Sequence, residues 1–277
     1  MRTVRLPSGE AVPCFGQGTW HMGEDSRRRA DEVRALRSGL DLGATLIDTA
    51  EMYGEGGCEE VVGEAIAGRR DGVFIVSKVY PHNASRVGAI AACERSLHRL
   101  GTDRIDLYLL HWRGSHPLAE TMEAFATLRR AGKIRHFGVS NLDTADMSEL
   151  WTTPHGDACA ANQVLYNLVR RGIEWELLPM QREKGLPVMA YSPLDQGRLV
   201  RDGRLAGFAK ANGITPAQAA LSWLASKDDV ILIPKSTREA RIRENLAALD
   251  KPLHEDQLAA LEALFPAPKG PVPLEMI

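Results

Sequence analysis

The chain has 277 residues, which is enough for one large α/β domain or two small ones and for a substantial buried core. Its 34 basic and 36 acidic residues nearly balance, so the net charge does not indicate binding to nucleic acid or to an anionic membrane. No apolar run could cross a bilayer, and the opening MRTVRLPSGEAV lacks the apolar core of a signal peptide. The four scattered cysteines predict reduced thiols in a cytoplasmic protein, with neither a disulfide framework nor a metal site such as zinc.

Eight short apolar segments recur along the chain and are predicted as strands. In chain order they begin at Pro13, Ala44, Gly72, Arg104, Lys133, Ala158, Leu186 and Asp229. Several are too apolar to alternate, as expected for strands that are buried on both faces of a parallel sheet. Most of their starts are about one βαβ unit apart.

The segments between these strands have helical spacing. Apolar residues of 87–100 lie broadly on one face, and Gly101 is placed to end that helix. Residues 118–128 repeat the pattern, and Gly132 closes it. The longer gap before the last strand leaves room for an insertion around LDQGRLVRDGRL, and a final helix around Leu258 is expected on the outside. The Pro-rich end, PAPKGPVPLEMI, is expected to run as a tail.

Eight strands that alternate with helices favour a (β/α)8 TIM barrel, an α/β fold, as a single domain over residues 1–277. The alternative is a doubly wound nucleotide-binding fold. That fold is disfavoured because the sequence has no G-x-G-x-x-G: in GQGTWH, His21 stands where the third glycine should be. The opening VRLPSGEAVP resembles a β-hairpin that turns at Ser8 and Gly9 and caps the bottom of the barrel.

Polar side chains gather at the ends of three consecutive predicted strands. Asp48 ends the second strand, Lys78 the third and His111 the fourth, while Tyr53 lies on the loop after the second. Each alone has an ordinary explanation as a turn, surface, rim or filler residue. Together they predict a catalytic cluster, because barrel enzymes carry their chemistry at the carboxyl ends of the strands.

The chemistry expected of this cluster is general acid catalysis. A buried Lys78 ammonium is expected to lower the pKa of the Tyr53 phenol, and Asp48 to hold Lys78 in place. The phenol would then protonate an oxygen as negative charge develops on it, and His111 would position a substrate carbonyl.

A set of ordered motifs carries a family resemblance: DTAEMYG, VSK, LYLLHW, GVSN, NQVLYN, AYSPL and IPKS. From residue 16 to about residue 245 the chain resembles the aldo-keto reductase superfamily, and GQGTWHMGE and PAPKG add a likeness to its bacterial methylglyoxal-reducing members. The resemblance implies a barrel that binds NADPH without a Rossmann fold and reduces carbonyl compounds by hydride transfer from the nicotinamide. It also implies a catalytic tetrad of Asp48, Tyr53, Lys78 and His111, with Tyr53 as proton donor.

The same resemblance assigns cofactor-binding residues. They are Gly18, Thr19, Trp20, Ser140, Asn141, Gln163, Tyr191, Ser192, Pro193, Leu194, Gln196, Gly197, Pro234, Lys235, Ser236, Arg241, Glu244 and Asn245. Ser140, Asn141 and Gln163 are expected to bind the carboxamide. Tyr191 is expected to stack on the nicotinamide, and residues 192–197 to line the pyrophosphate.

The segment IPKSTREARIREN bears on the choice between NADPH and NADH. Lys235, Ser236 and Arg241 match the positions that hold a 2′-phosphate, and two cations with a hydroxyl at the start of a helix suit an anion even without the analogy. The resemblance therefore predicts NADPH. Glu244 and Asn245 match the pair that contacts adenine.

Five residues are expected on the substrate side: Trp20, Met52, Tyr80, His111 and Trp112. The aromatic rings would form apolar walls against a small-molecule carbonyl substrate. Because the tail is short, the pocket is expected to be open and to accept several small or medium aldehydes. The enzyme is expected to be a monomer or weak oligomer.

Three other functions fit parts of the pattern. One is an accessory barrel that binds NADPH and regulates a membrane partner with little turnover. Another is an aldolase-type barrel in which Lys78 forms a Schiff base. A third is a sugar-phosphate enzyme in which Lys235 and Ser236 bind the substrate phosphate.

Overall fold

Eight parallel strands form the centre of the molecule, and each coincides with a segment predicted from the sequence. The structure is a computed structural model and describes all residues 1–277. The strands are β3 (Gly16–Gly18), β4 (Leu46–Asp48), β5 (Phe74–Val79), β6 (Ile105–Leu110), β7 (Ile134–Ser140), β8 (Cys159–Leu165), β9 (Val188–Tyr191) and β10 (Val230–Leu232). Each strand pairs with the next one along the chain, so the sheet order follows the sequence.

Two isolated bridges bring the first and last strands of the sheet together. Phe15 pairs with Leu232 and Gly18 with Lys235, both in parallel. The Gly18 N–H donates to the carbonyl of Pro234 at 3.1 Å. A Cβ at position 18 would lie 2.9 Å from the Ile233 carbonyl oxygen, so only glycine permits this approach. The predicted barrel is therefore confirmed, and an open doubly wound sheet is excluded.

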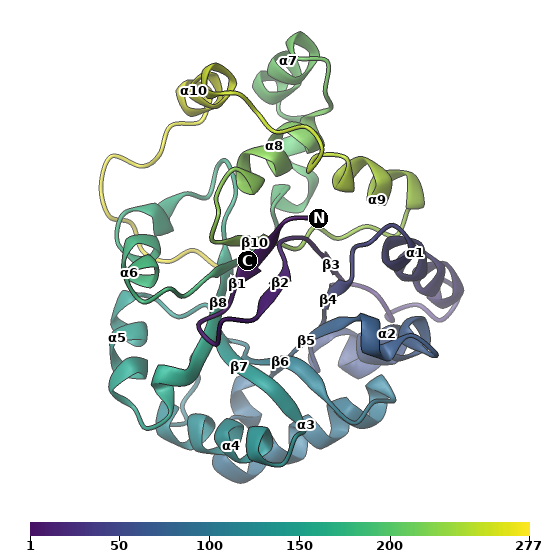
Figure 1. Cartoon of the computed structure of the whole chain (residues 1–277), viewed down its shortest axis with the longest axis vertical. Helices are drawn as coiled ribbons and strands as arrows, with labels where there is room; N and C mark the ends of the chain where they lie inside the picture. Colours follow the sequence, from purple (N-terminus) through teal and green to yellow (C-terminus); the bar gives the residue numbers. More distant parts are fainter.

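Helices surround the strands, as Figure 1 shows, and eight of them form the ring. They are α1 (Arg29–Asp41), α2 (Gly57–Ile66), α3 (Arg86–Leu100), α4 (Leu118–Arg130), α5 (Thr144–Thr152), α6 (Leu177–Glu183), α8 (Pro216–Ala225) and α9 (Glu239–Leu246). Two further helices, α7 (Gly203–Ala211) and α10 (Glu255–Leu264), lie together at one edge of the molecule. The predicted insertion and outer helix are thus α7 and α10.

Short 3-10 turns lie on several of the connections. They are η1 (Tyr53–Gly56), η2 (Arg70–Gly72), η3 (Pro81–Asn83), η4 (Gly156–Ala158), η5 (Gly172–Glu174), η6 (Asp195–Gly197) and η7 (Leu199–Arg201). Two of them, η1 and η6, follow β4 and β9 and hold residues predicted for the site.

Local sequence signals set the helix ends. Ser85 caps α3 by accepting a hydrogen bond from the Gly88 N–H, and Gly101 ends that helix with φ of 60°. Thr215 and Gln218 form a capping box around Pro216, the first residue of α8. These boundaries rest on neighbouring residues, so they could be read from the sequence.

The predicted N-terminal hairpin is also present. Strands β1 (Thr3–Arg5) and β2 (Ala11–Pro13) pair antiparallel and lead directly into the start of β3. In Figure 1 the hairpin lies across the middle of the ring. The Glu10 carboxylate binds Arg135 and His136 of β7, with oxygen–nitrogen distances of 2.7 and 2.8 Å. The hairpin therefore caps the amino-terminal end of the barrel.

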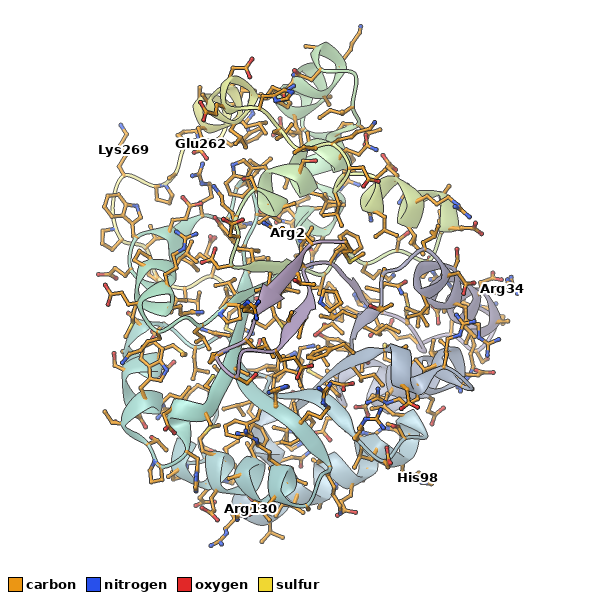
Figure 2. All side chains as sticks on the ribbon, in the orientation of Figure 1. Arg2, Arg34, His98, Arg130, Glu262 and Lys269 are labelled. Carbon is orange, nitrogen blue, oxygen red and sulfur yellow. The ribbon has the colours of Figure 1, made fainter.

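Apolar side chains fill most of the interior, and most charged ones lie outside; Asp48, Lys78 and Asp106 are among the charged side chains that are buried. One cluster of 73 buried residues includes side chains from the hairpin, the strands and the helices. Figure 2 shows Arg34, His98 and Arg130 at the periphery, pointing away from the barrel. No helix in the structure combines the length and apolar character that crossing a membrane requires.

Candidate active site

A cavity of about 600 Å³ lies at the carboxyl ends of the parallel strands, where most residues predicted for the site meet. The predicted residues in its wall are Gly18, Thr19, Trp20, Asp48, Met52, Tyr53, His111, Trp112, Ser140, Asn141, Gln163, Tyr191, Ser192, Pro193, Leu194, Gln196, Gly197, Pro234, Lys235, Ser236, Arg241, Glu244 and Asn245. The fold thus gathers the strand ends and the loops after them into one site.

Two predicted residues lie outside the wall of the cavity. Lys78 is completely buried, behind Asp48. Tyr80, expected in the substrate wall, instead packs edge-on against Trp112, with ring centroids 5.0 Å apart. Its N–H donates to a carboxylate oxygen of Glu51 at 2.7 Å. Tyr80 therefore supports the position of Trp112 from behind.

The cavity wall also contains residues that the sequence did not indicate. They are His21, Val200, Pro216, Ala217, Ile233, Met276 and Ile277. His21 follows Trp20 directly and stacks on it, with ring centroids 4.0 Å apart, so the motif GTWH was the available signal. Met276 and Ile277 belong to the tail, where no local pattern indicates a place in the site.

Lys78 is held by a tight set of acceptors. Its Nζ donates to both carboxylate oxygens of Asp48 at 2.9 Å and to the carbonyl of Thr49 at 2.8 Å. It lies 3.4 Å from the hydroxyl oxygen of Tyr53. Burial lowers the pKa of the Lys78 ammonium below its ordinary value, and the attraction of Asp48 opposes that shift. Three acceptors from the β4 end therefore fix the ammonium beside the phenol.

The pKa of Tyr53 departs from the sequence-based expectation. Burial raises the pKa of the phenol well above its ordinary value of 10.0, and the negative charge of Asp48 adds to the increase. The expected lowering by Lys78 was wrong in direction, because burial of the phenol and the charge of Asp48 outweigh the ammonium that was to favour the phenolate. As a result Tyr53 keeps its proton at neutral pH, which is the state that a proton donor needs.

His111 stands beside Tyr53 as a neutral imidazole. The two rings meet edge to face, with centroids 5.6 Å apart. Burial lowers the pKa of His111 to about 2, and the positive charge of Lys78 contributes to this shift. Its Nδ1 is buried and has no hydrogen-bond partner within the protein. A neutral imidazole at this place can orient a polar group but does not act as a cationic acid.

Amide and hydroxyl groups connect this cluster with the strands on the other side of the barrel. The Gln163 Nε2 donates to Asp48 at 2.7 Å, across 115 positions of sequence. The Asn141 Nδ2 donates to the carbonyl of His111 at 3.1 Å, and its Oδ1 accepts from the Tyr191 hydroxyl at 2.9 Å. The predicted carboxamide-binding residues therefore lie directly against the predicted tetrad.

Another part of the wall carries positive charge that the protein does not neutralise. Neither Lys235 nor Arg241 forms an ion pair with a carboxylate. Lys235 is exposed overall, but partial desolvation of its ammonium lowers the pKa, and the nearby positive charge of Arg28 lowers it further. Unpaired cations in a cavity wall favour an anionic ligand, as predicted for this segment.

Comparison with known proteins agrees with this site. A model of the aldo/keto reductase family matches residues 15–265. The chain belongs to the aldo/keto reductase family, in agreement with the motifs at the strand ends.

Individual relatives cover the whole chain. Methylglyoxal reductase YeaE of Escherichia coli is 51% identical over 100% of this chain and 99% of its own. A glyoxal reductase of Bacillus subtilis is 34% identical over 99% of this chain and 97% of its own. The crystal structure of an aldo/keto reductase from Klebsiella pneumoniae, in complex with NADP and acetate, is 51% identical and superimposes with a TM-score of 0.97 over 100% of this chain and 99% of that one.

Proposed function

We propose that this protein reduces small, uncharged aldehydes, with methylglyoxal as a favoured example, to the corresponding alcohols. The enzyme class itself is an NADPH-dependent oxidoreductase that acts on carbonyl groups. The observation that carries the proposal is the cluster of Tyr53, Lys78, Asp48 and His111 in one cavity with unpaired cations. The full-length similarity to a methylglyoxal reductase supports the choice of substrate.

The polar and charged groups that line the cavity are of the kinds that can bind NADPH. Ser140, Asn141 and Gln163 offer hydroxyl and amide groups beside the tetrad, and Lys235 and Arg241 offer cations for a phosphate. When NADPH is bound, its nicotinamide supplies a hydride to the carbonyl carbon. We infer that Tyr191 stacks on that ring and that residues 192–197 line the pyrophosphate.

The proton of the reaction comes from Tyr53 in this proposal. Its raised pKa keeps the phenol protonated until an oxygen of rising negative charge lies beside it. The phenolate left after transfer is stabilised by the Lys78 ammonium, 3.4 Å away. Asp48 keeps that ammonium in place, and neutral His111 orients the carbonyl oxygen.

The substrate end of the cavity favours an uncharged compound. Trp20, Met52 and Trp112 lie near the tetrad, and Met276 and Ile277 add apolar surface from the tail. Lys235 and Arg241 are the only lysine and arginine in the wall, and both are assigned to the cofactor phosphate. No cation therefore remains to bind a carboxylate on the substrate.

The position of Lys78 argues against an aldolase-type reaction. A Schiff base requires a lysine that can reach the substrate carbonyl. Lys78 is completely buried, does not line the cavity, and has its ammonium bound by Asp48 and Thr49. We therefore assign it to the tuning of Tyr53.

The test is NADPH oxidation by the purified protein with methylglyoxal, glyceraldehyde, a nitrobenzaldehyde and a sugar aldose. We expect turnover of methylglyoxal and the nitrobenzaldehyde, faster with NADPH than with NADH. Pyruvate, which carries a carboxylate, is the matched control and should react much more slowly. NADPH binding without turnover of any of these aldehydes would contradict the proposal and favour the accessory role.

We also propose that residues 1–277 act as one domain, in the cytoplasm, as a monomer or weak oligomer without a nucleic acid or membrane partner. The four cysteines are all unpaired and buried, which supports a reducing compartment. Sedimentation of the purified protein at several concentrations would test the oligomeric state.

A further inference from the structure

The turn after β8, residues 167–170, contacts two segments that are distant in sequence. The Asn167 side chain is buried, and its Nδ2 donates to the carbonyl of Ser192 at 2.9 Å. The Arg170 Nε lies 3.6 Å from Oδ1 of Asp195. The Arg170 Nη1 donates to the carboxylate of Glu275, which is 105 positions away. The turn therefore joins the loop after β9 to the C-terminal tail.

The loop after β9, residues 192–197, is called the coenzyme loop here because it is assigned to the pyrophosphate. Three of its non-glycine residues adopt left-handed backbone conformations: Ser192 with φ of 48°, Asp195 with 47° and Gln196 with 54°. Such conformations persist only where the surroundings hold them. Asp195 is 5% exposed, so its contact with Arg170 is one of the interactions that hold the loop.

The tail, residues 266–277, returns to the site from the outside. It leaves α10, passes α6 and ends inside the outline of the ring in Figure 1, while Lys269 lies at the outer edge in Figure 2. The Trp175 indole donates to the carbonyl of Pro268 at 2.6 Å. After the Glu275 contact with Arg170, Met276 and Ile277 line the cavity.

Arg170 pairs with both carboxylates at the same time because it uses different nitrogens for them. Nη1 donates a hydrogen bond to Glu275, and Nε lies 3.6 Å from Asp195 Oδ1, an ion pair without a hydrogen bond. A guanidinium that one carboxylate already orders loses less rotamer freedom when it contacts the second. The two contacts therefore reinforce each other instead of competing.

We propose that Arg170 is a positioning residue that couples the tail, and so the aldehyde end of the cavity, to the coenzyme loop. With the tail docked, Arg170 stays fixed against Asp195 and the loop stays closed over the cofactor. Release of the tail loosens the loop, so substrate binding and NADPH dissociation are linked. This inference rests on the proposed function, because it assigns the loop to the cofactor and the tail to the aldehyde.

The decisive variant is Glu275→Gln, which changes only the tail side of the contact. Stopped-flow displacement of NADPH, followed by nucleotide fluorescence, gives the dissociation rate, and steady-state assays give kcat and the KM for methylglyoxal. We expect NADPH dissociation to become about threefold faster and the KM to rise about threefold, within the range measured for coupled neighbouring residues. Arg170→Gln should produce larger changes of the same kind.

Arg198→Gln is the matched control. Arg198 also faces Asp195, at 3.8 Å, but it has no contact with the tail. It should alter the KM for methylglyoxal by less than Glu275→Gln does. A Glu275→Gln protein that changes the KM but not NADPH dissociation, or neither, overturns the coupling even if Arg170→Gln fails to fold. Absence of NADPH binding by the unchanged protein would instead overturn the proposed function.

Discussion

The two ends of the barrel differ in how completely their polar groups are paired within the protein. At the amino-terminal end, buried Asp106 accepts from Arg70 at 2.8 Å and from Arg135 at 3.0 Å, and Arg135 also binds Glu10. At the carboxyl end Asp48 and Lys78 are also paired, but Lys235 and Arg241 have no carboxylate partner, and the buried His111 Nδ1 has no partner either. Paired charges stabilise the closed barrel, whereas unpaired groups around a cavity favour a ligand.

This contrast also separates mutational effects. Substitutions of the paired charges at the amino-terminal end should lower the free energy of unfolding and leave kcat nearly unchanged. Substitutions of the cavity residues at the carboxyl end should lower kcat or raise a KM and leave the free energy of unfolding nearly unchanged. Four experiments test the separation.

The largest effect is expected for Tyr53→Phe. The substitution removes the proposed proton donor and keeps the ring, so kcat for methylglyoxal reduction should fall about 10³-fold, within the range attributed to general acid catalysis. The Kd for NADPH, measured by fluorescence titration, should change little. Turnover close to that of the unchanged protein would rule out Tyr53 as the donor.

The next effect is a loss of stability at the opposite end of the barrel. Asp106→Ala leaves Arg70 and Arg135 without their shared carboxylate and should reduce the free energy of unfolding by about 2–3 kcal/mol. Urea unfolding at fixed pH measures the change. kcat of the folded variant should remain within about twofold of the original; a loss of activity as large as that of Tyr53→Phe would contradict the separation of the two ends.

A smaller effect is expected for Arg241→Ala. If Arg241 binds the 2′-phosphate, its loss should raise the KM for NADPH about tenfold, as for one charge-assisted hydrogen bond, and leave the KM for NADH nearly unchanged. Arg243→Ala is the control, because Arg243 is exposed on the same helix and pairs with Glu239. Equal changes for both nucleotides would remove the assignment.

The smallest effect is the absence of a pH response in the neutral range. Tyr53 must be protonated to act, and its pKa is raised above 10.0, so deprotonation should not limit kcat below about pH 10. The pKa of His111 is lowered to about 2, so the imidazole stays neutral throughout and should add no inflection near pH 6.5. A pH profile of kcat measures both. An inflection near neutrality that His111→Asn abolishes would show that the imidazole titrates there.

Local sequence patterns were enough to predict the strands and most residues of the site. The strands were predictable because both faces are buried, so their residues read as continuous apolar runs. The positions of Asp48, Lys78 and His111 followed from the barrel, because its strand ends share one mouth. The predicted cofactor residues came from motifs at those same strand ends and loops, and these residues line the same cavity.

Sequence reasoning failed where an effect depends on the sum of many distant contacts. The pKa of Tyr53 was expected to fall because one neighbouring cation was considered, while burial by surrounding segments raises it. No local pattern indicated that Met276 and Ile277, at the end of the tail, line the wall of the cavity.

By itself the sequence determined the barrel, the order of its strands and the residue types at its mouth, because each follows from periodicity and from short motifs. Only the tertiary structure decided how these groups act on one another. The hydrogen bond from Gln163 to Asp48 joins residues 115 positions apart in the sequence, and the hydrogen bond from Arg170 to Glu275 joins residues 105 positions apart. Contacts of this kind depend on the closure of the barrel and on the path of the tail, for which a one-dimensional pattern carries no signal.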